Sequence, residues 1–135
     1  MKRMFLYSLT LAIITIITFA FSAMANDANE TNTDFLFSYG WIVDKEPIER
    51  VNLILPSYPD DVFTSYNHLQ KEAGLDILPY LGKICTRYTY IVKNYPKDID
   101  EPVRANILVA DGKIIAGDIM TVSSDGFMHS LVFPT

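Results

Sequence analysis

Residues 103–120 read VRANILVADGKIIAGDIM, and this stretch decides the fold. Two runs rich in β-branched residues flank Asp111-Gly112, a pair that favours a type I′ turn because both central residues of that turn need positive φ. With this pair as the loop, Ala110 stands opposite Lys113 and pairing continues outward from there. The sequence therefore predicts an antiparallel hairpin.

Uninterrupted pairing sets the two faces of this hairpin, since side chains alternate along a strand. The more apolar face then carries Val103, Ala105, Ile107, Val109, Ile114, Ala116, Asp118 and Met120. We take it as the core face. Asp118 is its one charged residue, and this register places it opposite Ala105.

Four further elements are predicted upstream: a short helix at 35–39, a strand at 48–55, the main helix at 60–73 and a strand at 83–94. The main helix has an apolar stripe at helical spacing, made of Val62, Phe63, Tyr66, Leu69, Gln70 and Ala73. We expect this stripe to pack on the core face of the hairpin. Tyr88 and Tyr90 of the preceding strand are expected on that same face.

These elements predict an α+β fold. An antiparallel sheet of four to five strands has one main helix packed across one face and a short N-terminal helix, which makes a two-layer architecture. With 135 residues the chain has room for one domain, which we place at residues 34–135.

The N-terminus has the pattern of a secretory leader. Lys2 and Arg3 precede an almost entirely apolar run at 5–21, and Ala23 and Ala25 form a small-residue cleavage site. We therefore predict a signal peptide at 1–25, a flexible spacer at 26–33 and an exported protein of the cell envelope or the extracellular space. The alternative is an uncleaved helix that anchors the chain in the membrane.

Charge and cysteine content exclude several function classes. Without Lys2 and Arg3, 9 basic residues face 16 acidic ones, so the mature chain carries 9 − 16 = −7. That balance argues against nucleic acid as a partner, and against a membrane surface unless the leader is kept as an anchor. The single cysteine, Cys85, makes no intramolecular disulfide.

Several short runs resemble one bacterial family, domain-of-unknown-function family number 4830. They are Gly40-Trp41, Tyr66-Asn67-His68-Leu69-Gln70-Lys71 with Gly74, Tyr80-Leu81-Gly82-Lys83, Arg87-Tyr88-Thr89-Tyr90, Asn94-Tyr95-Pro96, Val103-Arg104-Ala105-Asn106, Gly117-Asp118 and Gly126-Phe127-Met128-His129. The chain departs from the family at Ala116, where such sequences often have glycine. The resemblance implies an exported or tethered bacterial protein and supplies no activity.

No complete catalytic or metal motif accompanies this pattern. Cys85 lies near the start of a strand without an activating turn, so we expect an ordinary strand residue. Two separated histidines, His68 and His129, do not offer the ligand spacing of structural zinc. We therefore expect no catalytic residues, no metal and no cofactor.

The candidate binding residues are Asp118, His129, Tyr80 and Tyr95. Tyr80 and Tyr95 sit beside loops, where an amphipathic ring gives contact area at small entropic cost. Asp118 needs a partner on a buried face, which is either structural or part of a polar pocket with His129 and a tyrosine.

The function we favour is a small exported envelope module that binds another envelope protein, a peptide or a glycan without catalysis. Two alternatives remain open. One is a small hydrolase or metal-dependent enzyme that uses His129, His68 and Asp118. The other is a membrane-tethered regulatory domain, if the leader is not cleaved.

Cleavage after Ala25 would leave Asn26 as the mature N-terminus. Intact-mass analysis of the protein isolated from the envelope and the medium should give the mass of residues 26–135. A membrane-bound product that keeps Met1 would instead establish the anchored form.

Overall fold

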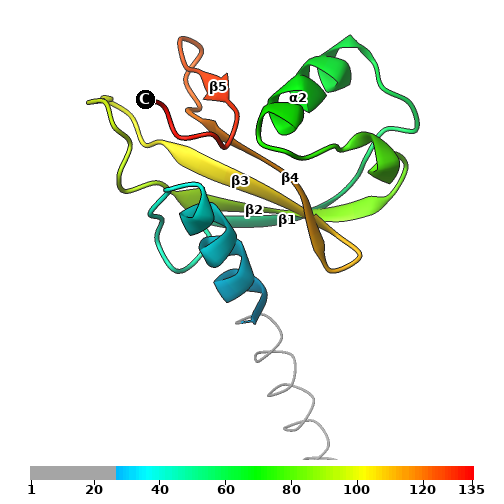
Figure 1. Cartoon of the computed structure of the whole chain (residues 1–135), viewed down its shortest axis with the longest axis horizontal. Helices are drawn as coiled ribbons and strands as arrows, with labels where there is room; N and C mark the ends of the chain where they lie inside the picture. Colours follow the sequence, from blue (N-terminus) through cyan, green and yellow to red (C-terminus); the bar gives the residue numbers. More distant parts are fainter. Residues whose placement is uncertain (1–26) are drawn as a thin grey trace, which may run out of the picture.

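The computed structural model describes residues 27–135, which form a five-stranded antiparallel sheet with helices on both faces (Figure 1). The strands are neighbours in chain order: β1 Glu49–Ile54, β2 Ile84–Ile91, β3 Arg104–Ala110, β4 Lys113–Met120 and β5 Met128–His129. Helix α2, Asp61–Glu72, and the 3₁₀ turn Leu78–Tyr80 link β1 to β2. The α+β prediction is confirmed. The predicted signal peptide lies outside the described residues.

An N-terminal helix occupies residues 27–38. The segment 26–33, which we expected to be a flexible spacer, is therefore helical from residue 27, and the expected short helix is only its end. Its polar residues are held by the sheet, because Asn32 donates to the Tyr90 hydroxyl (3.1 Å) and this hydroxyl donates to Asn29 (3.0 Å). The helix stops before Gly40, whose φ of 97° needs a residue without a Cβ.

The hairpin turn is as predicted, but the register beyond it is not. Asp111 and Gly112 have φ values of 51° and 72°, and Ala110 pairs with Lys113. The pairing then shifts by one residue, so that Val109 faces Ile114 while Leu108 faces Ala116, with Ile115 as the extra residue of a β-bulge.

This bulge moves Asp118 to the other face of the sheet. Asp118 stands opposite Asn106, and Ile119 takes the place opposite Ala105. Our uninterrupted register was therefore wrong from Ile115 onward. The cause is that Ile114 and Ile115 are both apolar, so the pattern does not tell which of them is the extra residue.

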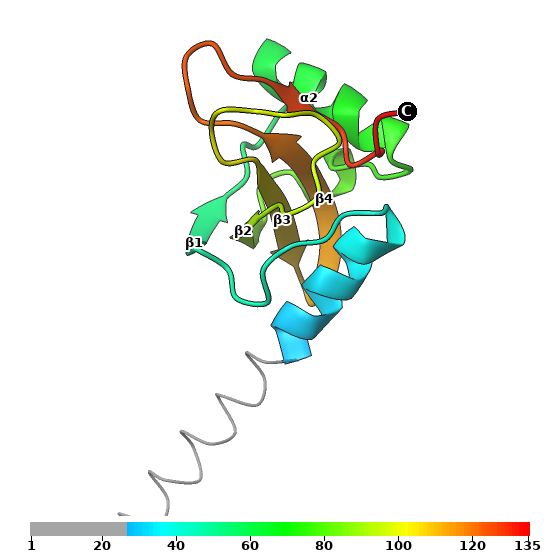
Figure 2. The same cartoon turned by 90° about the vertical axis from the view of Figure 1, so that its left-hand side faces the viewer.

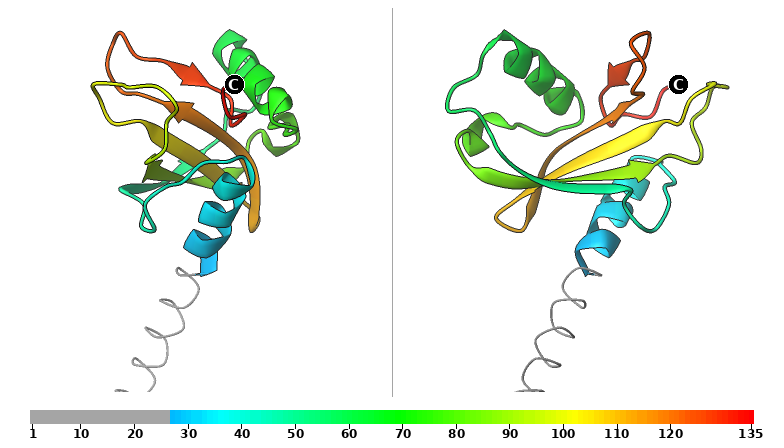
Figure 3. Two further views of the ribbon diagram at one scale, coloured as in Figure 1. Left: turned by 60° about the vertical axis from the view of Figure 1, so that its left-hand side comes forward. Right: turned by 180° about the vertical axis from the view of Figure 1, so that it is seen from behind.

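The two faces of the sheet carry two separate cores (Figure 3). The N-terminal helix covers the first, which consists of Leu36, Trp41, Tyr88, Tyr90, Val92, Val103, Ala105, Ile107, Ile119 and Leu131. Helix α2 covers the second, which consists of Leu55, Ile77, Cys85, Leu108, Ala110, Ile115 and Ala116. The main helix thus packs on one face as predicted, but Tyr88 and Tyr90 lie on the opposite one.

Helix α2 begins and ends where the sequence predicts. The Asp60 carboxylate accepts the Phe63 backbone N–H (2.8 Å), and Gly74 has a φ of 81°. Gln70 of the expected stripe is buried, but the buried face differs from the stripe at two other positions, because Val62 is 79% exposed and Asn67 is buried. These two polar side chains, Asn67 and Gln70, are buried because each accepts a hydrogen bond from a backbone N–H group that is not paired with another strand.

Gln70 is the clearest case. Its Oε1 accepts the N–H of Gly117 (2.8 Å), on the part of β4 that the short β5 leaves unpaired. A side chain at Gly117 has no room, because a Cβ would lie 2.8 Å from a Leu131 methyl carbon and 2.9 Å from the Asn106 carbonyl oxygen. This glycine therefore lets the edge of β4, α2 and the C-terminal segment meet.

Gly117→Ala should lower the free energy of unfolding by about 1–3 kcal/mol, since the clash with backbone cannot be relieved by a rotamer change. Chemical denaturation of parent and variant measures this difference. An unchanged midpoint would show that the register we describe for β4 is wrong.

Candidate functional site

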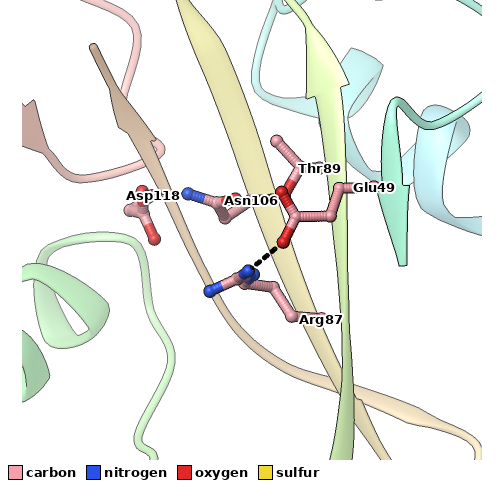
Figure 4. Close-up of polar contacts among 5 residues, drawn as sticks. All are labelled: Glu49, Arg87, Thr89, Asn106 and Asp118. Carbon is pink, nitrogen blue, oxygen red and sulfur yellow. Dashed lines mark hydrogen bonds and ion pairs between the residues drawn. The ribbon is translucent and has the colours of Figure 1, made fainter. Parts of the chain in front are cut away.

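A row of polar side chains crosses four strands on the α2 face of the sheet (Figure 4). Glu49 of β1 stands opposite Thr89 of β2, which stands opposite Asn106 of β3, which stands opposite Asp118 of β4. Residues directly opposite each other in neighbouring strands share a face, so the register alone aligns all four.

Hydrogen bonds connect the inner members of this row. The Thr89 hydroxyl donates to Asn106 Oδ1 (2.7 Å), and Asn106 Nδ2 donates to Asp118 Oδ2 (3.0 Å). The Tyr66 hydroxyl from α2 donates to the other Asp118 oxygen (2.8 Å). Both carboxylate oxygens therefore have a donor although Asp118 is only 2% exposed.

Burial raises the pKa of Asp118 above its ordinary value of 3.8, and the bonds from Asn106 and Tyr66 only partly oppose this effect. Desolvation disfavours the charged form of any carboxyl group. The same cause, reinforced by Asp118, raises the pKa of Tyr66 well above 10.0. The pair is a buried structural contact between helix and sheet.

Two arginines flank the row on the same face, Arg87 on β2 and Arg104 on β3. Arg87 forms an ion pair with Glu49 at the outer end of the row. The Nε atoms of both arginines are buried and have no acceptor among the described residues. Because neither atom reaches solvent, these unused donors do not make the row an accessible polar site.

The opposite face ends in an aromatic cluster, made of Trp41, Tyr95, Phe127, His129 and Phe133. The rings of Phe127 and His129 are stacked at 5.5 Å, and those of Tyr95 and Phe127 at 5.3 Å. Trp41 Nε1 donates to the Leu131 carbonyl (2.6 Å), which fixes the C-terminal segment over the cluster.

The histidine of this cluster is held at both ring nitrogens. His129 Nδ1 lies 2.7 Å from the Ser130 carbonyl oxygen, which only accepts, so Nδ1 carries the proton. Nε2 lies 3.0 Å from the Tyr95 hydroxyl and accepts its hydrogen in the neutral ring. Burial raises the pKa of Tyr95.

Two of the four candidate binding residues, His129 and Tyr95, are therefore in contact. Asp118 is not with them: His129 pairs with Ile119 and so lies on the face opposite to Asp118. The proposed polar pocket of Asp118 and His129 was wrong for this reason. Tyr80 belongs to the second core, with the Lys83 ammonium 5.7 Å from the centre of its ring.

The other candidate groups also lie apart. His68 is exposed on α2, and Cys85 is buried beneath it, where burial raises the pKa of the thiol. A raised pKa leaves less thiolate at neutral pH. Within residues 27–135 no group of three or more His, Cys, Asp or Glu side chains is placed to hold a metal ion.

A groove between the N-terminal helix and the segment that follows it was not foreseen. After Gly40 the chain runs back beside the helix toward β1 (Figures 1 and 2). A cavity of about 220 Å³ there is lined by Thr33, Asp34, Phe37, Trp41, Ile42, Val43 and Lys45. A second of about 330 Å³ is lined by Asn29, Glu30, Thr33, Lys45 and Glu46.

The two cavities share Thr33 and Lys45 as lining residues, so they are neighbours, and we refer to them together as the groove. We missed it because one of its walls is the segment that we interpreted as a spacer. No apolar periodicity marks this helix in the sequence, because the positions that face the sheet before Leu36 are the polar residues Asn29 and Asn32.

Sequence comparison matches residues 35–119 to a family described as domain of unknown function 4830 (DUF4830). The chain belongs to this family. The match spans β1 to β4 with α2, and thus the whole polar row with Tyr66. His129 and the first part of the N-terminal helix lie outside it. No significant match was found among curated proteins or among solved structures.

Within residues 27–135 the structure contains no helix that is long and apolar enough to cross a membrane.

The raised pKa of Asp118 gives a pH prediction. The folded chain holds this proton to higher pH than the unfolded chain, so stability contributed by Asp118 is present below pH 3.8 and is lost as pH rises through the folded pKa. Asp118→Asn cannot titrate. The stability of the variant relative to the parent should therefore improve as pH rises across this interval.

Urea denaturation of both proteins at a series of pH values tests this prediction. The difference between their free energies of unfolding cancels the pH dependence of the carboxyl groups that both proteins share. A pH-independent difference would contradict the raised pKa. Tyr66→Phe should lower stability by about 1–3 kcal/mol, because it leaves one oxygen of the buried Asp118 carboxyl group without a donor.

Proposed function

We propose that this protein is a small exported binding module of the bacterial envelope that works without catalysis. Its binding surface is the groove between the N-terminal helix and residues 41–46. The observation that carries the proposal is the exposure of large apolar side chains at this groove, where Phe37 is 67% and Ile42 is 48% exposed.

Exposed apolar side chains gathered at a concave surface are typical of interaction sites. Trp41 forms the floor and is fully buried, with its ring 4.6 Å from that of Phe133. The floor is therefore rigid while the rim is open to solvent. Such a surface loses little conformational entropy when it binds a partner.

The dispersal of the reactive groups supports binding over catalysis. A general acid or base must lie within hydrogen-bond reach of a second group and of substrate. Asp118 is saturated by Tyr66 and Asn106, and His129 by Tyr95 and Ser130. His68 forms no contact with either residue in the described part of the chain.

The partner classes are another envelope protein, a peptide or a glycan, and the leader at 1–25 places the module where it meets them. The net charge of −7 predicted for the mature chain argues against anionic polymers as partners, because like charges repel.

Binding should depend on Phe37. The purified mature protein is presented to a random peptide display library and to a glycan array, in parallel with Phe37→Ala and the control Val62→Ala. Val62 is 79% exposed on α2, away from the groove. We expect specific retention that Phe37→Ala weakens about tenfold or more and Val62→Ala leaves unchanged.

Both substitutions are at exposed positions, so the fold should be kept, and circular dichroism checks it. Absence of any specific ligand on either support would overturn the proposal. Ligands that Phe37→Ala binds as well as the parent would overturn the assignment of the groove.

A further inference from the structure

We propose that the groove takes an extended peptide segment in which a large apolar residue lies next to a lysine or arginine. This inference rests on the proposed function and names the partner of the same site.

The apolar requirement comes from the smaller cavity. Phe37, Trp41, Ile42 and Val43 surround it, and its only charged linings are Asp34 and Lys45 at the rim. A side chain that enters removes from water both its own surface and the exposed surface of Phe37 and Ile42. A polar residue at this position would lose its hydration without gaining a partner.

The basic requirement comes from the charges around both cavities. Glu30, Asp34 and Glu46 carry three negative charges along the groove, against one positive charge on Lys45. The only hydrogen bond that the structure gives these carboxylates within the described residues is a long one, from Asn29 Nδ2 to Glu46 (3.4 Å). A cationic side chain beside the apolar anchor would meet two carboxylates at the larger cavity.

The backbone of the groove wall favours a peptide. The Ile42 carbonyl accepts the Lys93 N–H (2.8 Å) and the Asp44 N–H bonds to the Ile91 carbonyl (3.1 Å), so these groups point toward β2. Because backbone groups alternate in extended chain, the N–H and C=O of Val43 point to the other side. An extended peptide there can pair with Val43 as an added strand does.

The smaller cavity is lined by residues 41–43 and 45 of this wall and the larger one by residues 45 and 46, so the two follow one another along the chain. Successive side chains of an extended peptide point to opposite sides, so residues at i and i+2 reach the same wall. The apolar and the basic residue would therefore be adjacent or separated by one position.

The experiment uses the mature protein and the same peptide display library, now sequenced after selection. We expect enrichment of lysine or arginine within two positions of leucine, isoleucine, phenylalanine or tryptophan. A labelled peptide of the enriched sequence, and its copy with glutamate in place of each basic residue, are then titrated by fluorescence anisotropy.

Glu30→Gln and Glu46→Gln should each weaken the basic peptide roughly two- to fivefold, as exposed ion pairs do. The matched control Glu72→Gln, on exposed α2, should leave its affinity unchanged. Added salt should weaken the parent more than the double variant, because exposed charges are screened.

This inference would be overturned if the library yielded acidic or uncharged peptides, or if both glutamine variants bound the basic peptide as tightly as the parent. If binding still depended on Phe37 in these cases, the groove would remain the binding site. If glycans were the only ligands whose binding Phe37→Ala weakened, the peptide inference would be overturned and the groove would be kept. Binding independent of Phe37 would remove the groove itself and the proposed function with it.

Discussion

The contact between Asp118 and Tyr66 is the interaction on which the arrangement of helix and sheet depends. It joins a carboxyl group at the centre of the sheet to α2, and its second oxygen is bound by Asn106 of the neighbouring strand. Removing one partner would leave a buried polar group unsatisfied, which costs more than the hydrogen bond contributes. The contact therefore specifies one position of α2, where apolar packing alone would accept several.

The β-bulge at Ile115 is what makes this contact possible. Without the extra residue, Asp118 would point toward the N-terminal helix and into the first core, where Tyr90 and Ile107 are fully buried. The inserted residue thus places the Asp118 carboxyl group under α2, where it is hydrogen-bonded, instead of among the apolar side chains of the first core. The same shift places Gly117 where Gln70 can bind its N–H. The bulge, Gly117 and the polar face of α2 together fix how α2 packs on β4.

Much of the fold could be predicted because local chemistry determines it. The Asp111-Gly112 turn and the helix predicted at 60–73 depend on residue types at their ends, and the structure has the turn there and a helix at Asp61–Glu72. The bulge could not be predicted, since two adjacent isoleucines fit either register equally well. Of the candidate site, His129 and Tyr95 could be named from sequence as candidate binding residues, but their contact is seen only in the structure. Placing Asp118 required the register, which local patterns leave open.

The groove shows why a polar segment next to a predicted leader is difficult to interpret from sequence. Asparagine and threonine are poor helix formers, so residues 27–33 have no intrinsic reason to be helical. Their helix exists because Asn29 and Asn32 bracket the hydroxyl group of Tyr90, a residue 58 positions beyond Asn32. That hydroxyl is buried, and burial raises the pKa of Tyr90 to about 12, so it remains a donor at physiological pH.

The wall of the groove is therefore attached to the centre of the sheet through one neutral tyrosine. Its outward side exposes Glu30, Asp34 and Phe37, the residues to which we assign the proposed contacts with a partner. Because Asn29 and Asn32 hold this helix through Tyr90, the exposed residues on its other side have no part in that attachment. The division along residues 27–38 between contacts with the sheet on one side and the recognition that we propose on the other follows from this attachment.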